Sequence, residues 1–468
     1  MAPYYSELLQ LCGYDDKEIT DQQHRIESAF KKLELGPQDM ERAAGRVKKY
    51  FDIELLGIRK TLGLWIKELI DLVLAREEGK KLIYYGYPPF QYTGLAIKAA
   101  AEEQGEFWIG CPEMIFCQTF GQIFDKLIPI LEEGEAQGLP PGHAMCSLLQ
   151  IKNGILSKKM ISTPDLSIAT SYFCDMGPKA DELMQYRYGD YPVLYIDSCL
   201  DSPWGEWPGF DQERVHYFGK QLNGLFQSLK DLLGIEVTTD VWYGARTLAA
   251  PLFMATNNLS MLLASDPVPL DVADSELVVN LPAAGMGVAI EEGAEAVEIL
   301  VEEVKKRVEE GFGVVPQNAP RVLLTFQSLV DPVFNRLFSE VGLAVPSIYV
   351  LLPPPPKPKS QPYPTLGEKR AEVAMYGGMY HSSYGLIKRM QECIAFTQVD
   401  GIVYNYHYAC RPLTCNSKLL KPFIERESKL PTLLLDMDYY DDRNYSAAAL
   451  RTRLEAFAEM LKARKATA

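Results

Sequence analysis

The sequence predicts an α/β protein with two parallel-sheet regions, an N-terminal helical segment and a helical connection. Two observations predict this class. Short apolar runs that suit buried strands alternate with helical stretches, and this alternation occurs twice along the 468 residues. Strands that alternate with helices form parallel pairs joined by right-handed crossovers. We therefore expect four consecutive parts, of which the second and the fourth carry the sheets: residues 1–80, 81–207, 208–315 and 316–468.

The first part is predicted to be entirely helical. Apolar side chains recur there at spacings of three and four residues with charged residues between them, which is the pattern of helices that bury one face. The predicted helices span residues 21–33, 37–54 and 57–75.

The first sheet region begins with a change of pattern at residue 81. Short runs rich in β-branched and aromatic residues predict strands over 81–86, 106–111, 166–174 and 191–199. Helices are predicted over 95–104 and 147–160. Three of these strand-like runs end directly in a cysteine, at Cys111, Cys174 and Cys199.

The connection and the second sheet region follow the same logic. Helical periodicity returns from 208 to 312, including 215–233 and 291–310. Strands are then predicted over 320–326, 346–352, 400–410 and 431–438, and the third of these runs ends in Cys410. The proline-dense segment 353–362 suits neither a helix nor a central strand, so we expect a stiff surface loop there.

The composition excludes several classes of partner. The formal net charge is −15, which argues against a nucleic-acid or anionic-membrane surface because both attract clustered Lys and Arg. The N-terminus has no basic region followed by a long apolar stretch, and no segment offers about 18 uninterrupted apolar residues. We expect a cytoplasmic protein.

The nine cysteines are odd in number and widely spaced, which does not suit a disulfide framework. In a parallel α/β sheet, ligands collect outside the carboxyl ends of the strands, so cysteines at strand ends point into a shared crevice. A single cysteine is more often a small buried hydrophobe, and we expect that role for Cys12 and Cys393. Cys146 opens a predicted helix, whose partial positive charge favours a thiolate.

The cysteine spacing favours an iron-sulfur cluster over zinc. Cys111 and Cys117, like Cys410 and Cys415, are farther apart than the two-residue spacing of structural zinc sites. Thiolates from remote positions suit an iron-sulfur cluster, because soft sulfur ligands suit iron and each iron takes a single protein thiolate.

Several motifs give the chain a family resemblance: 146–154 (Cys-Ser-Leu-Leu-Gln-Ile-Lys-Asn-Gly), 163–166, Phe173-Cys174-Asp175, 400–403 with Cys410, 430–438 and 450–460. From about residue 81 onward the chain resembles the 2-hydroxyacyl-CoA dehydratase and benzoyl-CoA reductase superfamily, of the 2-hydroxyglutaryl-CoA dehydratase D-component type. The resemblance implies two Rossmann-like domains that hold a 4Fe-4S cluster on three cysteines matching Cys146, Cys174 and Cys410. It also implies an ATP-hydrolysing iron-sulfur activator protein that delivers single electrons, and a homodimer or a heterodimer with a related subunit.

The chain also departs from the dehydratases of that superfamily. Residues 87–93 stand where an acidic motif is usual, and four further cysteines lie near the expected cluster: Cys111, Cys117, Cys199 and Cys415. An 8Fe-9S double cubane needs six thiolates. The chain therefore resembles the double-cubane-cluster branch, which reduces small molecules. We expect Cys117, Cys199 and Cys415 to complete the set, with Cys111 as the alternative sixth ligand.

Two histidines are candidates for proton transfer or for hydrogen bonds to cluster sulfur. His143 and His407 each lie three residues before an expected ligand, although a structural role satisfied by the backbone is the commoner case. No glycine-rich phosphate loop occurs in the sequence, so ATP is expected to bind the partner. Two other functions remain open: a 2-hydroxyacyl-CoA dehydratase subunit with one 4Fe-4S cluster, and a non-catalytic electron-transfer protein that carries a cluster.

Overall fold

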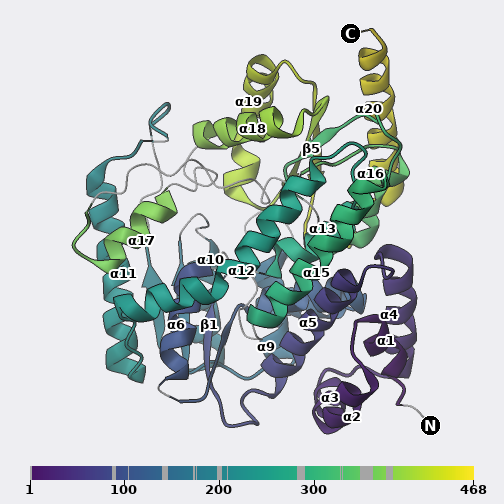
Figure 1. Ribbon diagram of the computed structural model, residues 1–468. Coiled ribbons are helices and arrows are strands. Elements are labelled where there is room, and N and C mark those ends of the chain that lie inside the picture. Colours follow the sequence, from purple (N-terminus) through teal and green to yellow (C-terminus); the bar gives the residue numbers. More distant parts are fainter. Residues whose placement is uncertain are drawn as a thin grey trace.

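The computed structural model shows an α/β fold with two parallel sheets, as predicted (Figure 1). It describes residues 3–86, 91–103, 105–139, 146–171, 174, 176–197, 203–207, 209–281, 290–326, 328, 330–347, 362–375 and 383–467, and within α6 and α19 it leaves some side chains undescribed. None of the helices in these ranges is long and apolar enough to cross a membrane.

The N-terminal part is helical, and local sequence signals mark where its helices begin and end. Asp15 caps the second helix, because its side chain accepts a hydrogen bond from the main-chain N–H of Glu18, whose carboxylate accepts one from Asp15 N–H. The helix predicted over 21–33 is confirmed and begins at Gln23, after the preceding helix ends at Asp21. The helices are α1 (Ser6–Leu11), α2 (Asp16–Asp21), α3 (Gln23–Lys32), α4 (Pro37–Tyr50) and α5 (Leu56–Leu74).

The first sheet has the strand order β2-β1-β3-β4, and every pair is parallel. Its strands are β1 (Lys81–Tyr85), β2 (Phe107–Gly110), β3 (Leu166–Thr170) and β4 (Val193–Ile196). The chain moves from β1 to one side for β2 and then to the other side for β3. A crevice for ligands forms at such a reversal, outside the carboxyl ends of the strands.

The helices of this region follow or precede the strands of the first sheet. They are α6 (Gln91–Glu102), α7 (Pro112–Phe116), the π-helix η1 (Cys117–Ile123), α8 (Ile128–Ala136), α9 (Ser147–Ser157) and α10 (Met176–Tyr188). The π-helix directly continues α7, and single turns of this kind are frequent at functional sites.

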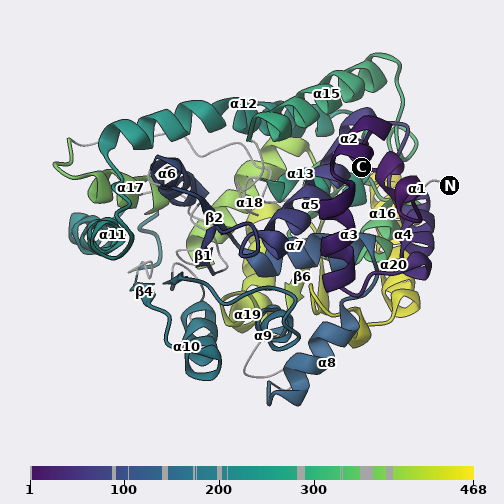
Figure 2. The ribbon, with the colours of Figure 1, turned by 90° about the horizontal axis from the view of Figure 1, so that it is seen from below.

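The connecting region is helical, as expected, and its helices α12 (Thr239–Leu263) and α15 (Ile290–Glu309) lie along one outer side of the molecule (Figure 2). Glu303 in α15 ties this side to the N-terminal part, since its two carboxylate oxygens accept hydrogen bonds from the first N–H groups of α5, those of Leu56 and Gly57, at 2.8 and 3.0 Å. The other helices of the connecting region are α11 (Gln212–Leu233) and the buried α13 (Val272–Val279).

The second sheet has the order β5-β6-β7, again parallel, with the strands β5 (Val322–Leu324), β6 (Gly401–His407) and β7 (Thr432–Met437). A parallel bridge joins Arg321 to Ala344 on the side of β5 that does not face β6. The chain therefore adds a segment first on one side of β5 and then on the other, as it does around β1 in the first sheet. The strand expected over 346–352 lies mostly outside the described residues. The accompanying helices are α16 (Pro332–Glu340), α17 (Leu366–Met375), α18 (Ser383–Thr397), α19 (Arg411–Ser428), the short η3 (Asp442–Asn444) and α20 (Ala447–Thr467).

In both sheets, an aspartate just before one strand makes two hydrogen bonds to the start of the neighbouring strand. Asp165, just before β3, accepts a hydrogen bond from the N–H of Leu82 at 2.7 Å and donates its own N–H to Leu82 O at 2.8 Å. Asp400, just before β6, makes the same two bonds with Arg321, each at 2.8 Å. The pair β1/β3 therefore corresponds to β5/β6, and the carboxyl ends of β3 and β6 occupy equivalent places.

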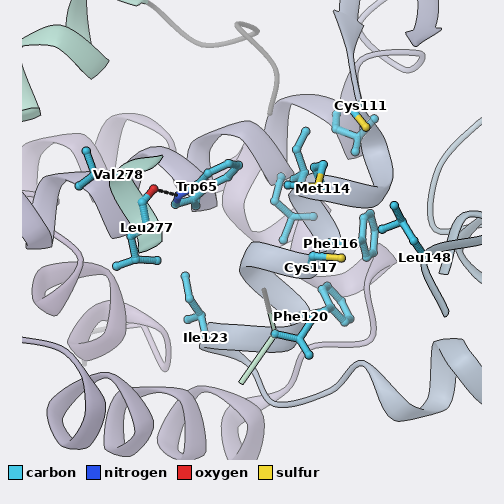
Figure 3. Packing of buried hydrophobic residues seen from close by; sticks show 14 of the residues in the cluster. Trp65, Cys111, Met114, Phe116, Cys117, Phe120, Ile123, Leu148, Leu277 and Val278 are labelled. Carbon is cyan, nitrogen blue, oxygen red and sulfur yellow. Dashed lines mark hydrogen bonds between the residues drawn. The ribbon is translucent and has the colours of Figure 1, made fainter. Parts of the chain in front are cut away.

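One hydrophobic core runs through the N-terminal helices, both sheets and the connection. Figure 3 shows part of it, in which the indole N–H of Trp65 in α5 donates to the main-chain oxygen of Leu277 in α13 at 3.2 Å. A second core lies under α18 and α19. The predicted helical and sheet-bearing stretches thus fold against one another, while their division into separate domains stays a prediction.

Candidate metal centre

Two of the predicted ligands occupy matching positions at helix starts. Cys410 follows β6 and precedes α19, and its N–H donates to the main-chain oxygen of His407 at 2.8 Å. Cys146 precedes α9 in an extended conformation, and its oxygen accepts the N–H of Leu149 at 3.0 Å. Both side chains are half-buried. A helix start presents N–H groups and partial positive charge, which suits an anionic ligand or cluster.

Cys174 lies beside Cys146. Both cysteines pack against one small apolar cluster made by Leu149, Met176 and Ala180, in which α9 meets α10. The strand β3 ends at Thr170, four residues before Cys174, so the expectation of a strand that continues to the cysteine was wrong. The backbone leaves the sheet earlier because β4, its pairing partner, ends at Ile196 opposite Thr170.

Cys146, Cys174 and Cys410 lie close enough to interact electrostatically. Burial raises the pKa of the Cys146 thiol well above its usual value, and the charges of Cys174, Asp438 and Cys410 raise it further. The helix start and burial thus act in opposite directions on Cys146, and its thiolate form stays a prediction. A metal would have to displace the proton, which couples metal binding to proton release.

Cys117 and Cys111 are both fully buried, and partly different charges act on them. Burial raises the pKa of Cys117, and Cys146 and Asp438 are among the charges that add to the rise. The corresponding charges around Cys111 include those of Glu113 and Cys117. In Figure 3 the two cysteines lie on successive turns, Cys117 beside Phe120 and Cys111 farther away. The choice between Cys117 and Cys111 as a ligand stays a prediction.

The remaining predicted site residues lie outside what the structure describes. Cys199 and His143 fall in undescribed segments, and Cys415 lies in α19 with an undescribed side chain. Cys12 and Cys393 are both buried, as expected for structural cysteines. Burial raises the pKa of Cys393 to about 11.

His407 ends β6 and is buried. Its Nε2 lies 3.6 Å from Asp438 Oδ1, a long contact for an ion pair. Burial lowers the pKa of His407, and Asp438 opposes that effect. Its main-chain oxygen accepts both the N–H of Cys410 and the hydroxyl of Thr414, at 2.8 and 2.6 Å. The backbone of His407 thus shapes the turn that carries Cys410.

Asp438 is a site residue that the cysteine pattern did not reveal. It follows β7, is 2 % exposed, and accepts hydrogen bonds from the hydroxyl of Ser147 and from the N–H of Tyr440, the latter at 2.9 Å. Burial raises its pKa. The sequence signal was an aspartate at the end of a predicted strand, and only the fold shows that Ser147 lies opposite.

A buried ion pair lies beneath the first-sheet side of the site. Lys152 Nζ lies 2.7 Å from Asp181 Oδ1 and 3.9 Å from Glu113 Oε1, and the Ser167 hydroxyl donates to Asp181 at 2.5 Å. These contacts join α9, α10, α7 and β3. Because the lysine and both carboxylates are almost inaccessible, their mutual charge compensation is needed to keep them buried.

Across the described ranges, no three His, Cys, Asp or Glu side chains lie close enough together to hold a single metal ion. Cys146, Cys174 and Cys410 approach one another from remote parts of the sequence. That donor set fits an iron-sulfur cluster, whose thiolates bind different irons and are therefore spaced more widely than ligands of one ion. The residues that would hold it are Cys146, Cys174, Cys410 and Cys117.

Comparison with known proteins agrees with this picture. The family model described as 2-hydroxyglutaryl-CoA dehydratase, D-component, matches residues 125–461. The chain is also 22 % identical over 305 residues to the alpha subunit of (R)-2-hydroxyglutaryl-CoA dehydratase from Acidaminococcus fermentans. That alignment covers 64 % of this chain and 61 % of the relative, so the chain spans about three fifths of the relative's length. Since the family model covers well over half of the chain, the protein belongs to the 2-hydroxyglutaryl-CoA dehydratase D-component family.

Proposed function

We propose that the protein is the iron-sulfur component of a reductase, which receives low-potential electrons from an ATP-hydrolysing activator and reduces a small molecule at a double-cubane cluster. The observation that carries this proposal is the approach of Cys146, at the start of α9, to Cys174 and Cys410, which follow the equivalent strands β3 and β6, with Cys117 as a fourth thiol. Three cysteines suffice for one 4Fe-4S cluster with an open iron. The fourth supports a larger one.

The electrostatics of the site explain why an energised donor is needed. Burial raises the pKa of Cys117, and the negative charges of Glu113 and Asp438 are among those that raise it further. Fixed negative charge and low polarity oppose any further negative charge, so both place the reduction potential low. An ordinary donor would reduce such a site poorly. Coupling to ATP hydrolysis on a partner protein supplies the missing driving force.

When bound, the cluster would supply one-electron chemistry, and the chain supplies the rest. Its thiols bind the cluster, the helix starts at Cys146 and Cys410 direct N–H groups toward it, and the apolar contacts of Leu149, Met176 and Ala180 keep water away. A double cubane requires two further thiolates. We propose Cys199 and Cys415 for these, with Cys111 as the alternative.

Iron analysis of the anaerobically purified protein tests the proposal. About eight irons per chain support the double cubane, about four support a single cluster, and zinc alone excludes both. Cys146→Ser, Cys174→Ser and Cys410→Ser should each lose most of the iron. Cys393→Ser is the matched control, because it makes the same substitution at a buried cysteine of α18 that is not an expected ligand. A variant set in which the control loses as much iron as the others would contradict the assignment.

The second candidate is a 2-hydroxyacyl-CoA dehydratase subunit with one 4Fe-4S cluster. The similarity to an (R)-2-hydroxyglutaryl-CoA dehydratase subunit favours it. Turnover of a 2-hydroxyacyl-CoA with activator and ATP, together with about four irons, would support this candidate over the first. Electron uptake without turnover of any substrate would instead favour a non-catalytic carrier. Assembly as a homodimer, or as a heterodimer with a related subunit, is proposed for either enzyme.

A further inference from the structure

One buried hydrogen bond connects the two sheet regions directly at the candidate metal centre. The hydroxyl of Ser147 donates to Oδ1 of Asp438, and both side chains are almost fully buried, at 3 % and 2 % exposure. Ser147 is the first residue of α9 and follows Cys146. Asp438 follows β7, on the far side of the site. The bond therefore joins segments 291 residues apart in the sequence.

Asp438 is also fixed relative to Cys410. The strand β7 pairs with β6 up to the register His407 with Met437, and Tyr408 N–H donates to Met437 O at 3.1 Å. The residues just beyond these paired ends are Asp438 on one strand and the turn to Cys410 on the other. The N–H of Tyr440, two residues further along the chain, donates to Oδ1 of Asp438 at 2.9 Å.

We propose that Asp438 is a positioning residue that holds Cys146 in place relative to Cys410 through the hydroxyl of Ser147. The role of the cysteines in this statement rests on the proposed function. The geometry does not: Asp438 joins the start of α9 to the end of the second sheet whatever the site binds. A hydrogen bond to a buried carboxylate is strong and directional, and losing the donor leaves the carboxylate under-satisfied.

Five variants separate positioning from general stability. Ser147→Ala removes the donor, and Ser147→Thr keeps it. Two controls make the same chemical changes away from the joint: Ser157→Ala at the other end of α9, where the hydroxyl donates to Glu133, and Asp436→Asn, whose side chain in β7 is exposed. Asp438→Asn keeps an acceptor oxygen for Ser147 but removes the charge.

The first measurement uses the full-length protein freed of metal, followed by hydrogen exchange and mass spectrometry. Ser147→Ala should speed exchange at least several-fold in peptides that cover 146–152 and 438–441. Ser147→Thr and both controls should leave these peptides at the wild-type rate. Unchanged exchange in Ser147→Ala would show that the hydrogen bond between Ser147 and Asp438 does not hold the two regions together.

The second measurement uses the anaerobically purified protein. Ser147→Ala should lose at least half of its iron and alter the electron-paramagnetic-resonance spectrum of what remains, and Ser147→Thr should restore both. Asp438→Asn should keep more iron than Ser147→Ala but shift the midpoint potential upward, because a fixed negative charge is gone. Faster exchange with wild-type iron and spectrum overturns the positioning role. A wild-type protein without iron overturns the proposed function, and the exchange result alone then decides whether Asp438 joins the regions.

Discussion

The carboxylate of Glu276 accepts a hydrogen bond from the side-chain amide of Gln118 across 2.9 Å, in the fully buried space between α13 and the π-helix η1. Gln122 and Asn280 donate to the same carboxylate. Burial raises the pKa of Glu276 to about 8, and the three amides oppose this rise without cancelling it. A buried group with such a pKa makes stability depend on pH in the neutral range.

Glu276→Gln should flatten that dependence. The folded pKa of about 8 lies above the usual value of 4.5, so the folded state holds the proton more tightly. The resulting stability is complete below about pH 4.5 and is lost as pH rises through about 8. The wild-type protein should therefore lose a few kcal/mol more than the variant between about pH 5 and pH 9. Urea unfolding at both pH values measures this. Glu298→Gln, an exposed change on α15, is the control, and parallel curves for wild type and Glu276→Gln would refute the expectation.

Gly154→Ala should destabilise the protein strongly, by about 3 kcal/mol or more, because a Cβ at this position would lie 2.2 Å from the main-chain oxygen of Ile130. The helices α8 and α9 can approach closely only without that atom. Gly224→Ala is the matched control, since nothing lies within 4 Å of a Cβ there. It should stabilise α11 by up to about 1 kcal/mol. Equal thermal midpoints for the two variants would show that α8 and α9 adjust to the added atom.

Lys152→Met should cost about 3–5 kcal/mol, because it leaves the Asp181 carboxylate buried without its cation. Lys179→Met removes a lysine from an exposed pair with Glu182 and should leave the unfolding midpoint unchanged. Restoration of stability by the double change Lys152→Met with Asp181→Leu would identify charge compensation as the cause. A double variant no better than the single one would point to packing instead.

Asp400→Ala should cost about 1–3 kcal/mol, because Arg321 N–H would lose its acceptor at the start of β5. Asp165→Ala should cost a similar amount at β1, since the two aspartates play equivalent parts. Denaturant unfolding compares both with Asp190→Ala, an exposed aspartate in a loop. A large effect at one position alone would show that the two sheets do not depend equally on this device.

The alternation of strands and helices was sufficient to predict the fold class, because each strand-helix unit is marked locally by the period of its apolar residues. Strand ends were harder to predict. The run 166–174 stays largely apolar beyond Thr170, so no local signal marks the point at which pairing with β4 stops. The helix α12 contains Pro251, which local rules disfavour inside a helix, and packing against α15 overrides that preference.

The cysteines of the candidate site could be proposed from the sequence, whereas the residues around them could not. Cys146, Cys174 and Cys410 stand out because they follow or precede predicted elements. Cys111 directly precedes α7 and Cys117 begins the π-helix, and no local signal in the sequence marks either position. Asp438 and Glu276 depend on partners more than 100 residues away, which no local pattern reveals.

The hydrophobic core that runs from the first helix through both sheets limits how far the two sheet regions can move relative to one another. Separating them would expose that shared apolar interior to water, at a cost proportional to the area uncovered. We therefore expect the two sheet regions to move as one body.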